Sequence, residues 1–173
     1  MLWGDVSPTD GMFDPALPVI GPFQGPWRIL SNFYPLPVQV PLDAWPVAWG
    51  GGPGLVCDGA STEHVYQQMK WLRRDPVRAE LARLAPTPSA AKRAGSGHPE
   101  GWAGVSLLAM ELCIRAKFAS GGPLATALVA TGLHPLAEIN TWGDTFYGVC
   151  GGRGCNHLGR LLMEQRRRLV RGA

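Results

Sequence analysis

The segment from Glu138 to Gly159 combines several residue types that recognise ligands. Its two carboxylates and six glycines are interspersed with amide, aromatic and basic side chains, those of Asn140, Trp142, Phe146, Tyr147, Arg153 and Asn156. Such a segment is too polar and glycine-rich for the core, and too aromatic for an ordinary solvated loop. Aromatic, acidic and amide groups on one loop could together recognise a planar ligand that is linked to a sugar.

Three glycines of this segment, at positions 151, 152 and 154, stand just before Asn156. Asn156 is a favourable N-cap for the helix expected after it, and exposed backbone N–H groups at such a place could hold an anion. A glycine cluster before a helix is by itself weak evidence of phosphate binding, and a plain connection between two elements is the alternative.

A second polar group lies in a helix predicted to begin after a cap at Ser61 or Thr62. The apolar residues of this helix fall on one face, and the opposite face gathers Glu63, Gln67, Lys70 and Arg74. A surface helix with its polar face in water and a functional site with that face in a pocket both fit this spacing. Periodicity alone favours the surface helix.

The elements that must position these groups change in character along the chain. Residues 1–60 hold ten of the sixteen prolines, which excludes long helices there. Short strands are predicted over Trp27–Phe33, Val38–Val40 and Leu55–Cys57, and they would form a small antiparallel sheet.

Helices are predicted over most of the remainder. Two of them are predicted to start at caps, Asp75 and Thr87, and an apolar pattern predicts a third over Trp102–Phe118. A shorter helix is predicted over Pro123–Thr131, and a last helix is predicted to begin at Asn156. A strand over Leu136–Ile139 leads into the polar loop.

The composition fits a globular protein, with 46% apolar and 17% charged residues. No apolar run approaches the roughly 18 to 20 residues of a membrane span, and the start lacks the basic and apolar regions of a secretory signal. We therefore expect a cytoplasmic protein without membrane association. The four cysteines form no CxxC pair and the four histidines lack metal-binding spacing, so no metal is expected.

Charge is distributed unevenly along the chain. Residues 1–62 carry one Arg and five Asp, whereas residues 63–173 carry 15 basic and 8 acidic residues. The second part could attract phosphates, but the arginines at 166, 167, 168 and 171 fit a solvated helix end equally well. An RNA-binding helix would need aromatic residues among these arginines, and residues 160–173 contain none.

Six short pieces of the chain, taken in their order and spacing, resemble the NADAR family, the YbiA-like N-glycosidases. The resemblance runs from about Phe23 to Leu169. Its pieces are PFQGPWRILSNFYP, STEHVYQQMK, AAKRAG, the segment from Trp102 to Lys117-Phe118, TWGDTFYG and GCNHLGRLLMEQR.

This resemblance implies an α+β fold. It predicts one compact, mainly helical domain over residues 23–173 after an irregular segment 1–22, with a small antiparallel sheet built largely from the N-terminal third. It also implies hydrolysis of the N-glycosidic bond between a phospho- or ADP-ribose and a nucleobase or base-like amine. The implied substrates are phosphoribosylated intermediates of riboflavin synthesis and ADP-ribosylated guanine, including guanine in nucleic acid. No cofactor and no obligate protein partner are implied.

The resemblance assigns site residues through the pattern E-H-x-x-Q-x-x-K and the glycine-rich loop. In its light the polar helix face belongs to a pocket. The expected catalytic residues are Glu63, Lys70 and Asp144. The expected substrate-binding residues are Asn32, Phe33, Gln67, Trp142, Tyr147, Gly148 and Asn156. Where the family usually has Trp before the glycine, this chain has Tyr147, and this departure supports the alternative of a non-catalytic module that binds ADP-ribose or a nucleotide.

Cleavage of a ribose N-glycosidic bond develops positive charge at the anomeric carbon, which a carboxylate can stabilise while it activates water. Glu63 is the first choice for this role and Asp144 the second. Lys70 could bind phosphate, keep Glu63 ionised, or attack the opened ribose to form a Schiff base, which requires a lowered pKa. A structural salt bridge is the alternative for Lys70.

Overall fold

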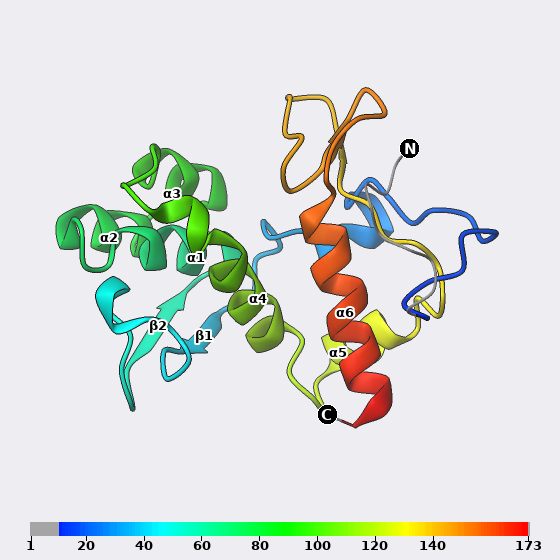
Figure 1. Ribbon diagram of the computed structural model, residues 1–173, viewed down its shortest axis with the longest axis horizontal. Helices are drawn as coiled ribbons and strands as arrows, with labels where there is room; N and C mark the ends of the chain where they lie inside the picture. Colours follow the sequence, from blue (N-terminus) through cyan, green and yellow to red (C-terminus); the bar gives the residue numbers. More distant parts are fainter. Residues whose placement is uncertain (1–10, 173) are drawn as a thin grey trace. The chain divides into compact units, whose positions relative to one another are not determined.

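The computed structural model of the protein describes residues 11–172 (Figure 1). The described chain folds into two compact units. It leaves the first unit after residue 31 and returns to it at residue 118. Residues 11–31 and 118–172 build one unit, and residues 32–117 build the other. We call these the outer-sequence unit and the central unit.

The central unit contains the antiparallel sheet. Strands β1 (Val38–Pro41) and β2 (Val56–Gly59) pair with Val38 opposite Gly59, and the side chains of β1 alternate between buried and exposed. This alternation is the period-2 pattern of a strand with one face on the core. The predicted small sheet in the N-terminal third is confirmed.

Four α-helices complete the central unit, and their bounds are α1 (Thr62–Trp71), α2 (Pro76–Arg83), α3 (Pro88–Ala94) and α4 (Ser106–Lys117). Helix α1 packs against the other three helices and both strands. The caps predicted for α2 and α3 are confirmed, since Asp75 accepts from Arg78 N and Thr87 accepts from Ala90 N. A single 3-10 turn, Trp102–Gly104, precedes α4 within the span predicted as one helix.

The core of the central unit is partly aromatic. Trp102 makes edge-to-face contacts with three aromatic rings, at centroid distances of 6.2 Å to Trp45, 5.5 Å to Trp49 and 5.4 Å to Tyr66. Such arrangements add about 0.5–1.5 kcal/mol per pair to the burial of the rings themselves. This cluster fixes the inner end of the proline-rich segment against α1.

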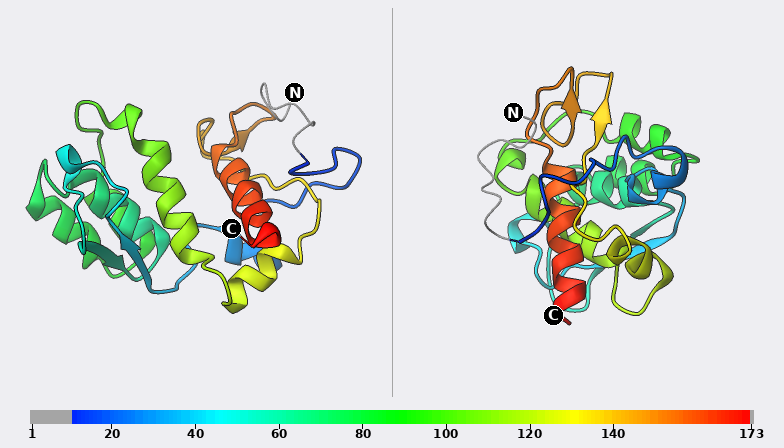
Figure 2. Two further views of the ribbon diagram at one scale, coloured as in Figure 1. Left: turned by 60° about the horizontal axis from the view of Figure 1, so that its bottom comes forward. Right: turned by 90° about the vertical axis from the view of Figure 1, so that its right-hand side faces the viewer.

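The outer-sequence unit contains α5 (Pro123–Val129), the two-residue strands β3 (Ile139–Asn140) and β4 (Val149–Cys150), and α6 (His157–Arg171). Strands β3 and β4 are parallel and lie side by side next to the N-terminal end of α6 (Figure 2, right). The strand predicted over Leu136–Ile139 is therefore shifted, since most of that span pairs only through an isolated bridge between Leu136 and Ile20.

The predicted strand over Trp27–Phe33 is wrong. Residues Gly25–Leu30 form a 3-10 helix, with Pro26 in its first turn. Proline fixes φ near −65°, a value that suits a helical turn, and this local constraint outweighs the apolar content of the segment.

Arg166 fits neither of the two alternatives for the arginines near the C-terminus, attraction of phosphates and a solvated helix end, because it is buried. Its guanidinium is buried and donates to Thr131 Oγ1 at 2.8 Å, His134 O at 2.9 Å and Met12 O at 2.6 Å. Burial lowers the pKa of Arg166 to about 10. This residue is a structural link between α6 and the loops of its unit.

Within residues 11–172, no helix is both long and apolar enough to cross a bilayer.

Candidate active site

Helix α1 carries the first group of predicted site residues, and all ten of its residues are buried. The interpretation of α1 as a surface helix with a water-facing polar side is therefore wrong. Glu63 is 6% exposed and Lys70 is 4% exposed. Because removing a carboxylate and an ammonium from water is costly, a helix that buries both is a functional-site candidate.

Glu63 is held at both its backbone and its side chain. Its N–H donates to Asn32 O at 3.1 Å, and its Oε1 accepts from Gln67 Nε2 at 2.7 Å. Gln67 thereby fixes the orientation of the carboxylate, while its own Oε1 is buried without a hydrogen-bond partner in the described part of the chain. A buried amide oxygen without a donor calls for a water or a ligand group to supply one.

Lys70 lies two turns along α1 from Glu63, and its Nζ donates to Gly97 O at 3.1 Å. Burial lowers the pKa of Lys70 to about 8; the charge of Glu63 acts in the opposite direction, and those of Lys92 and Arg78 lower the pKa further. Near neutral pH the uncharged fraction of this amine is therefore far larger than that of an ordinary lysine, although the charged form still predominates. The uncharged amine is the nucleophilic form that imine formation requires.

The two predicted binding residues before β1 lie in the same unit. The side chain of Asn32 is buried and donates to the sulfur of Met110 at 3.2 Å, a weak acceptor. The Phe33 ring is half-buried and has Lys92 Nζ at 5.9 Å from its centroid. The hydrogen bond from Glu63 N–H to Asn32 O joins this segment to the start of α1.

Lys117 is a buried titratable residue that sequence reasoning did not select. It ends α4, burial lowers its pKa to about 7, and its Nζ lies 5.5 Å from the centroid of the Tyr34 ring. The one feature of the sequence that could have indicated Lys117 is its position in Lys117-Phe118, the end of one of the segments that resemble the family.

The outer-sequence unit carries the second group of predicted residues, on the loop between β3 and β4. Asp144 Oδ1 accepts from the backbone N–H groups of Phe146 at 3.0 Å and Tyr147 at 2.9 Å. This is an Asx turn, which shapes the aromatic loop from within. Trp142 and Phe146 are 56% and 44% exposed, so their rings are available to a ligand.

Asn140 supports the same loop from its base. Its Nδ2 donates to Asp144 O at 2.7 Å, and its Oδ1 accepts from Asp144 N at 3.1 Å. Gly148 ends the loop, and a Cβ there would lie 2.5 Å from Glu138 O and 2.6 Å from Asn140 Nδ2. Only glycine fits this close approach of two backbone segments.

Asn156 stands at the N-cap position of α6 as predicted, but its side chain does not cap the helix. With φ at +50°, it directs Nδ2 to Leu136 O and accepts from Glu138 N through Oδ1. The first N–H groups of α6 are also occupied, because His157 donates to Phe146 O and Leu158 to Tyr147 O. These N–H groups are therefore not available to an anion.

Residues 11–172 contain no group of three His, Cys, Asp or Glu side chains that lie closely enough together to bind a metal ion. All four cysteines are free thiols, and burial raises the pKa of Cys57 to about 12. A thiol with so high a pKa is a poor nucleophile. Among the residues predicted from the sequence, Glu63 and Lys70 are therefore the candidate reactive groups of the central unit.

The chain is similar to proteins of one known family. The NADAR domain family model matches residues 22–170. The chain is 33% identical over 145 residues to N-glycosidase YbiA of Escherichia coli, covering 81% of this chain and 80% of that protein. It is 34% identical over 145 residues to a riboflavin biosynthesis protein of Vibrio vulnificus, of which it spans only 35%.

The fold is matched as well. The NMR structure of E. coli YbiA aligns with a TM-score of 0.68 at 27% identity, over 90% of this chain and 86% of that one. The family match runs through both units, and the α+β fold expected from the sequence is confirmed. The chain belongs to the NADAR domain family.

Proposed function

We propose that this protein is an N-glycosidase that hydrolyses the bond between a ribose and a nucleobase or base-like amine. The observation that carries this proposal is the burial, on one face of α1, of Glu63 and of a Lys70 amine whose pKa is lowered to about 8. The names of the relatives, N-glycosidase YbiA among them, support the same activity.

Glu63 acts on the developing positive charge at the anomeric carbon. Its Oε1 is oriented by Gln67 Nε2, which leaves a carboxylate fixed in a site with little water. A carboxylate in such surroundings stabilises a nearby cation far more than it would in bulk solvent. The unpartnered Gln67 Oε1 would accept a hydrogen bond from a ribose hydroxyl.

Lys70 supplies the nucleophile. In the ring-opened ribose, C1 is doubly bonded to the nitrogen of the base. The neutral amine adds to C1, both of its protons pass to the base nitrogen, and the C1–N bond to the base breaks as the C1=N imine with Lys70 forms. Water then adds to the C1=N imine, which releases the amine and a ribose that carries the oxygen of water at C1. The hydrogen bond to Gly97 O keeps the amine directed before substrate binds.

The loop between β3 and β4 recognises the base. Trp142, Phe146 and Tyr147 offer rings for stacking, and Asp144 holds the backbone N–H groups of Phe146 and Tyr147. Gly148 and Asn156 shape the loop through their packing and hydrogen bonds. The substrate class is a phosphoribosylated or ADP-ribosylated compound, such as an intermediate of riboflavin synthesis or ADP-ribosylated guanine. A relative named as a riboflavin biosynthesis protein favours the first of these.

The proposal is tested by incubating the protein with phosphoribosylamino pyrimidines and ADP-ribosylated guanine and measuring the released base by chromatography. Glu63→Gln should lower kcat about a hundredfold or more, because it removes the charge with little change in volume. Glu80→Gln makes the same chemical change at an exposed acid of α2 and should leave kcat unchanged. A Glu63→Gln variant with normal kcat would remove Glu63 from the mechanism.

Reduction during turnover tests the role of Lys70. Borohydride should trap a sugar on Lys70, detectable by peptide mass spectrometry, and Lys70→Arg should yield neither adduct nor product, because a guanidinium is a poor nucleophile. An active Lys70→Arg variant would leave Lys70 an electrostatic role only. If the parent binds a substrate in calorimetry and releases no base from any of them, the chain is a binding module.

A further inference from the structure

The loop that accepts the Lys70 hydrogen bond is itself held by side chains. Three consecutive carbonyl groups, those of residues 95–97, each accept from a different side chain of α1 or α2. Trp71 Nε1 donates to the first at 3.0 Å, Arg78 Nη1 to the second at 3.3 Å and Lys70 Nζ to the third at 3.1 Å. The position of the Lys70 amine is thus tied to the position of this loop.

Arg78 connects the loop to the helices. Its guanidinium carbon lies 4.2 Å from the centroid of the Trp71 ring, and its Nε lies 3.5 Å from Asp75 Oδ2. The guanidinium therefore stacks on the aromatic ring that holds the first carbonyl while it holds the second carbonyl itself. Its ion pair with Asp75 is exposed and contributes little to stability, so the contacts with the ring and loop distinguish this arginine.

The loop also approaches α1 closely at Gln67, one turn before Lys70 and Trp71. A Cβ at Gly95 would lie 2.4 Å from Gln67 Oε1 and 2.8 Å from Gln67 Cβ, so the backbone of the loop packs directly on the residue that orients Glu63. Gly97 has a φ of +82°, a conformation that side chains rarely adopt. A displacement of this loop would reach both Gln67 and Lys70.

We propose that Arg78 is a positioning residue for Lys70, acting through the loop of residues 95–97. This inference rests on the proposed function, in which Lys70 is the reactive amine. Arg78 does not touch the amine; it holds the carbonyl of Ser96, which is adjacent to the Gly97 carbonyl that the amine bonds, and so keeps the loop in place over a buried nitrogen.

The charges around Lys70 set the direction of the expected effect. Burial is the main reason that the pKa of Lys70 is low; Glu63 on α1 opposes it, and Lys92 on α3 and Arg78 on α2 add to it. A loosened loop admits water to the amine, and loss of the Arg78 charge removes a repulsion. Both changes raise the pKa of Lys70 and reduce the neutral fraction near pH 7.

The chain contains three lysines, Lys70, Lys92 and Lys117, so protein labelled with ¹³C-lysine gives three side-chain titrations by NMR. The Lys70 signal is assigned by its loss in Lys70→Arg. Arg78→Met removes the guanidinium and keeps an aliphatic side chain on the Trp71 ring. Arg78→Lys keeps the positive charge and loses the planar group that stacks and bonds the loop.

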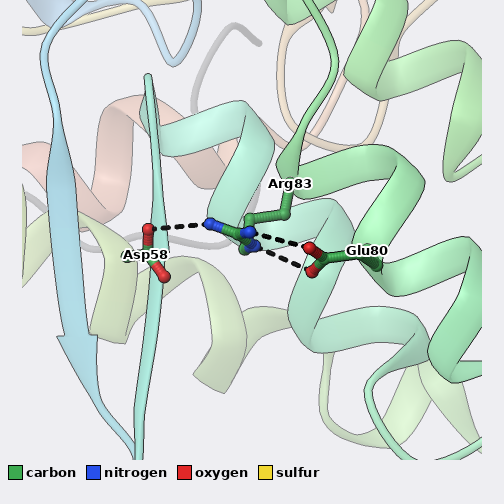
Figure 3. Close-up of polar contacts among 3 residues, drawn as sticks. All are labelled: Asp58, Glu80 and Arg83. Atoms are coloured by element: carbon green, nitrogen blue, oxygen red, sulfur yellow. Dashed lines mark hydrogen bonds and ion pairs between the residues drawn. The ribbon is translucent and has the colours of Figure 1, made fainter.

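Arg83 provides the matched control on the same helix. It bonds Glu80 and Asp58, as Figure 3 shows, and no hydrogen bond or ion pair joins it to the loop of residues 95–97. Arg83→Met therefore removes the same functional group from α2 without touching the proposed linkage. It should leave both the Lys70 titration and kcat unchanged.

The proposal expects Arg78→Met and Arg78→Lys to behave alike, with the Lys70 titration midpoint raised above that of the parent and kcat lowered about tenfold. Parent-like behaviour of Arg78→Lys would show that charge alone matters and would overturn positioning through the loop. A Lys70 titration midpoint equal to that of the parent, in either Arg78 variant, would also overturn the proposal. Since the titration needs no substrate, it decides the inference even if none of the proposed substrates is cleaved.

Discussion

Replacing Lys70 by methionine should make the protein more stable near neutral pH while removing its activity. Lys70 is buried, and its pKa is lowered from the ordinary 10.5 to about 8. Below pH 8 the folded protein must hold a charge that the unfolded chain accommodates in water. Methionine has a similar length and carries no charge, so it avoids this cost.

The size of the effect follows from the shift. About 2.5 pKa units at 1.36 kcal/mol each correspond to roughly 3 kcal/mol in favour of the unfolded chain when the amine is charged in both states. The lost hydrogen bond to Gly97 O offsets about 1 kcal/mol, whereas the attraction of Glu63 is already contained in the lowered pKa. A net gain of about 2 kcal/mol is expected for Lys70→Met.

The pH dependence gives the prediction its sign. Between pH 8 and 10.5 the unfolded chain binds a proton that the folded protein releases, so the free energy of unfolding of the parent rises with pH over this window. Lys70→Met lacks this rise, and the difference between variant and parent should be largest at pH 8 and below and shrink toward pH 10.5. Urea unfolding followed by tryptophan fluorescence, repeated from pH 7 to 10, measures it.

Lys92→Met serves as the control, because Lys92 is exposed on α3 and its replacement should change the free energy of unfolding by less than about 0.5 kcal/mol. The reasoning would be refuted if Lys70→Met were less stable than the parent by an amount that does not vary with pH. That result would mean that Lys70 is a fully ionised member of a structural ion pair.

Two further predictions concern the loop between β3 and β4. Asp144→Asn keeps the oxygen that accepts from Phe146 N and Tyr147 N, so it should retain kcat within about threefold, whereas Asp144→Ala should raise KM about tenfold; equal inactivity of both variants, measured by base release, would instead make the Asp144 charge catalytic. Tyr147→Trp restores the residue usual in the family and should lower KM with kcat unchanged, because stacking on a larger ring contributes about 1 to 3 kcal/mol per base. A KM equal to that of the parent would mean that the departure at this position has no functional effect.

The features predicted correctly from the sequence are those that neighbouring residues determine. Asp75 and Thr87 cap their helices through N–H groups three residues away, and the alternation around Val38 suffices to place β1. Helical spacing placed Glu63 and Lys70 on one helix face, and both residues lie in the observed helix α1. Each of these signals lies within one or two turns of the chain, where periodicity and capping chemistry operate.

The features missed depend on contacts between distant segments. Asn156 has the composition of a cap, but its amide bonds residues 18 and 20 positions earlier, which no local pattern reveals. The surroundings of α1 bury its polar face, so spacing alone gave the wrong exposure. Lys117 becomes a titratable group of interest only because the fold buries it, and its neighbours in sequence do not indicate this.

The backbone bonds from the start of α6 to the carbonyl groups of Phe146 and Tyr147 have an evolutionary consequence. They fix the path of the loop through main-chain atoms, together with the side chains of Asp144 and Asn140. The Trp142 ring is 56% exposed, whereas the Phe146 ring packs on the rings of Tyr147 and His157, with centroids 4.9 Å and 4.5 Å away. Substitutions at Trp142 can therefore accumulate with little penalty in folding, so related proteins can vary the ring that we propose stacks on the base while α1 stays the same.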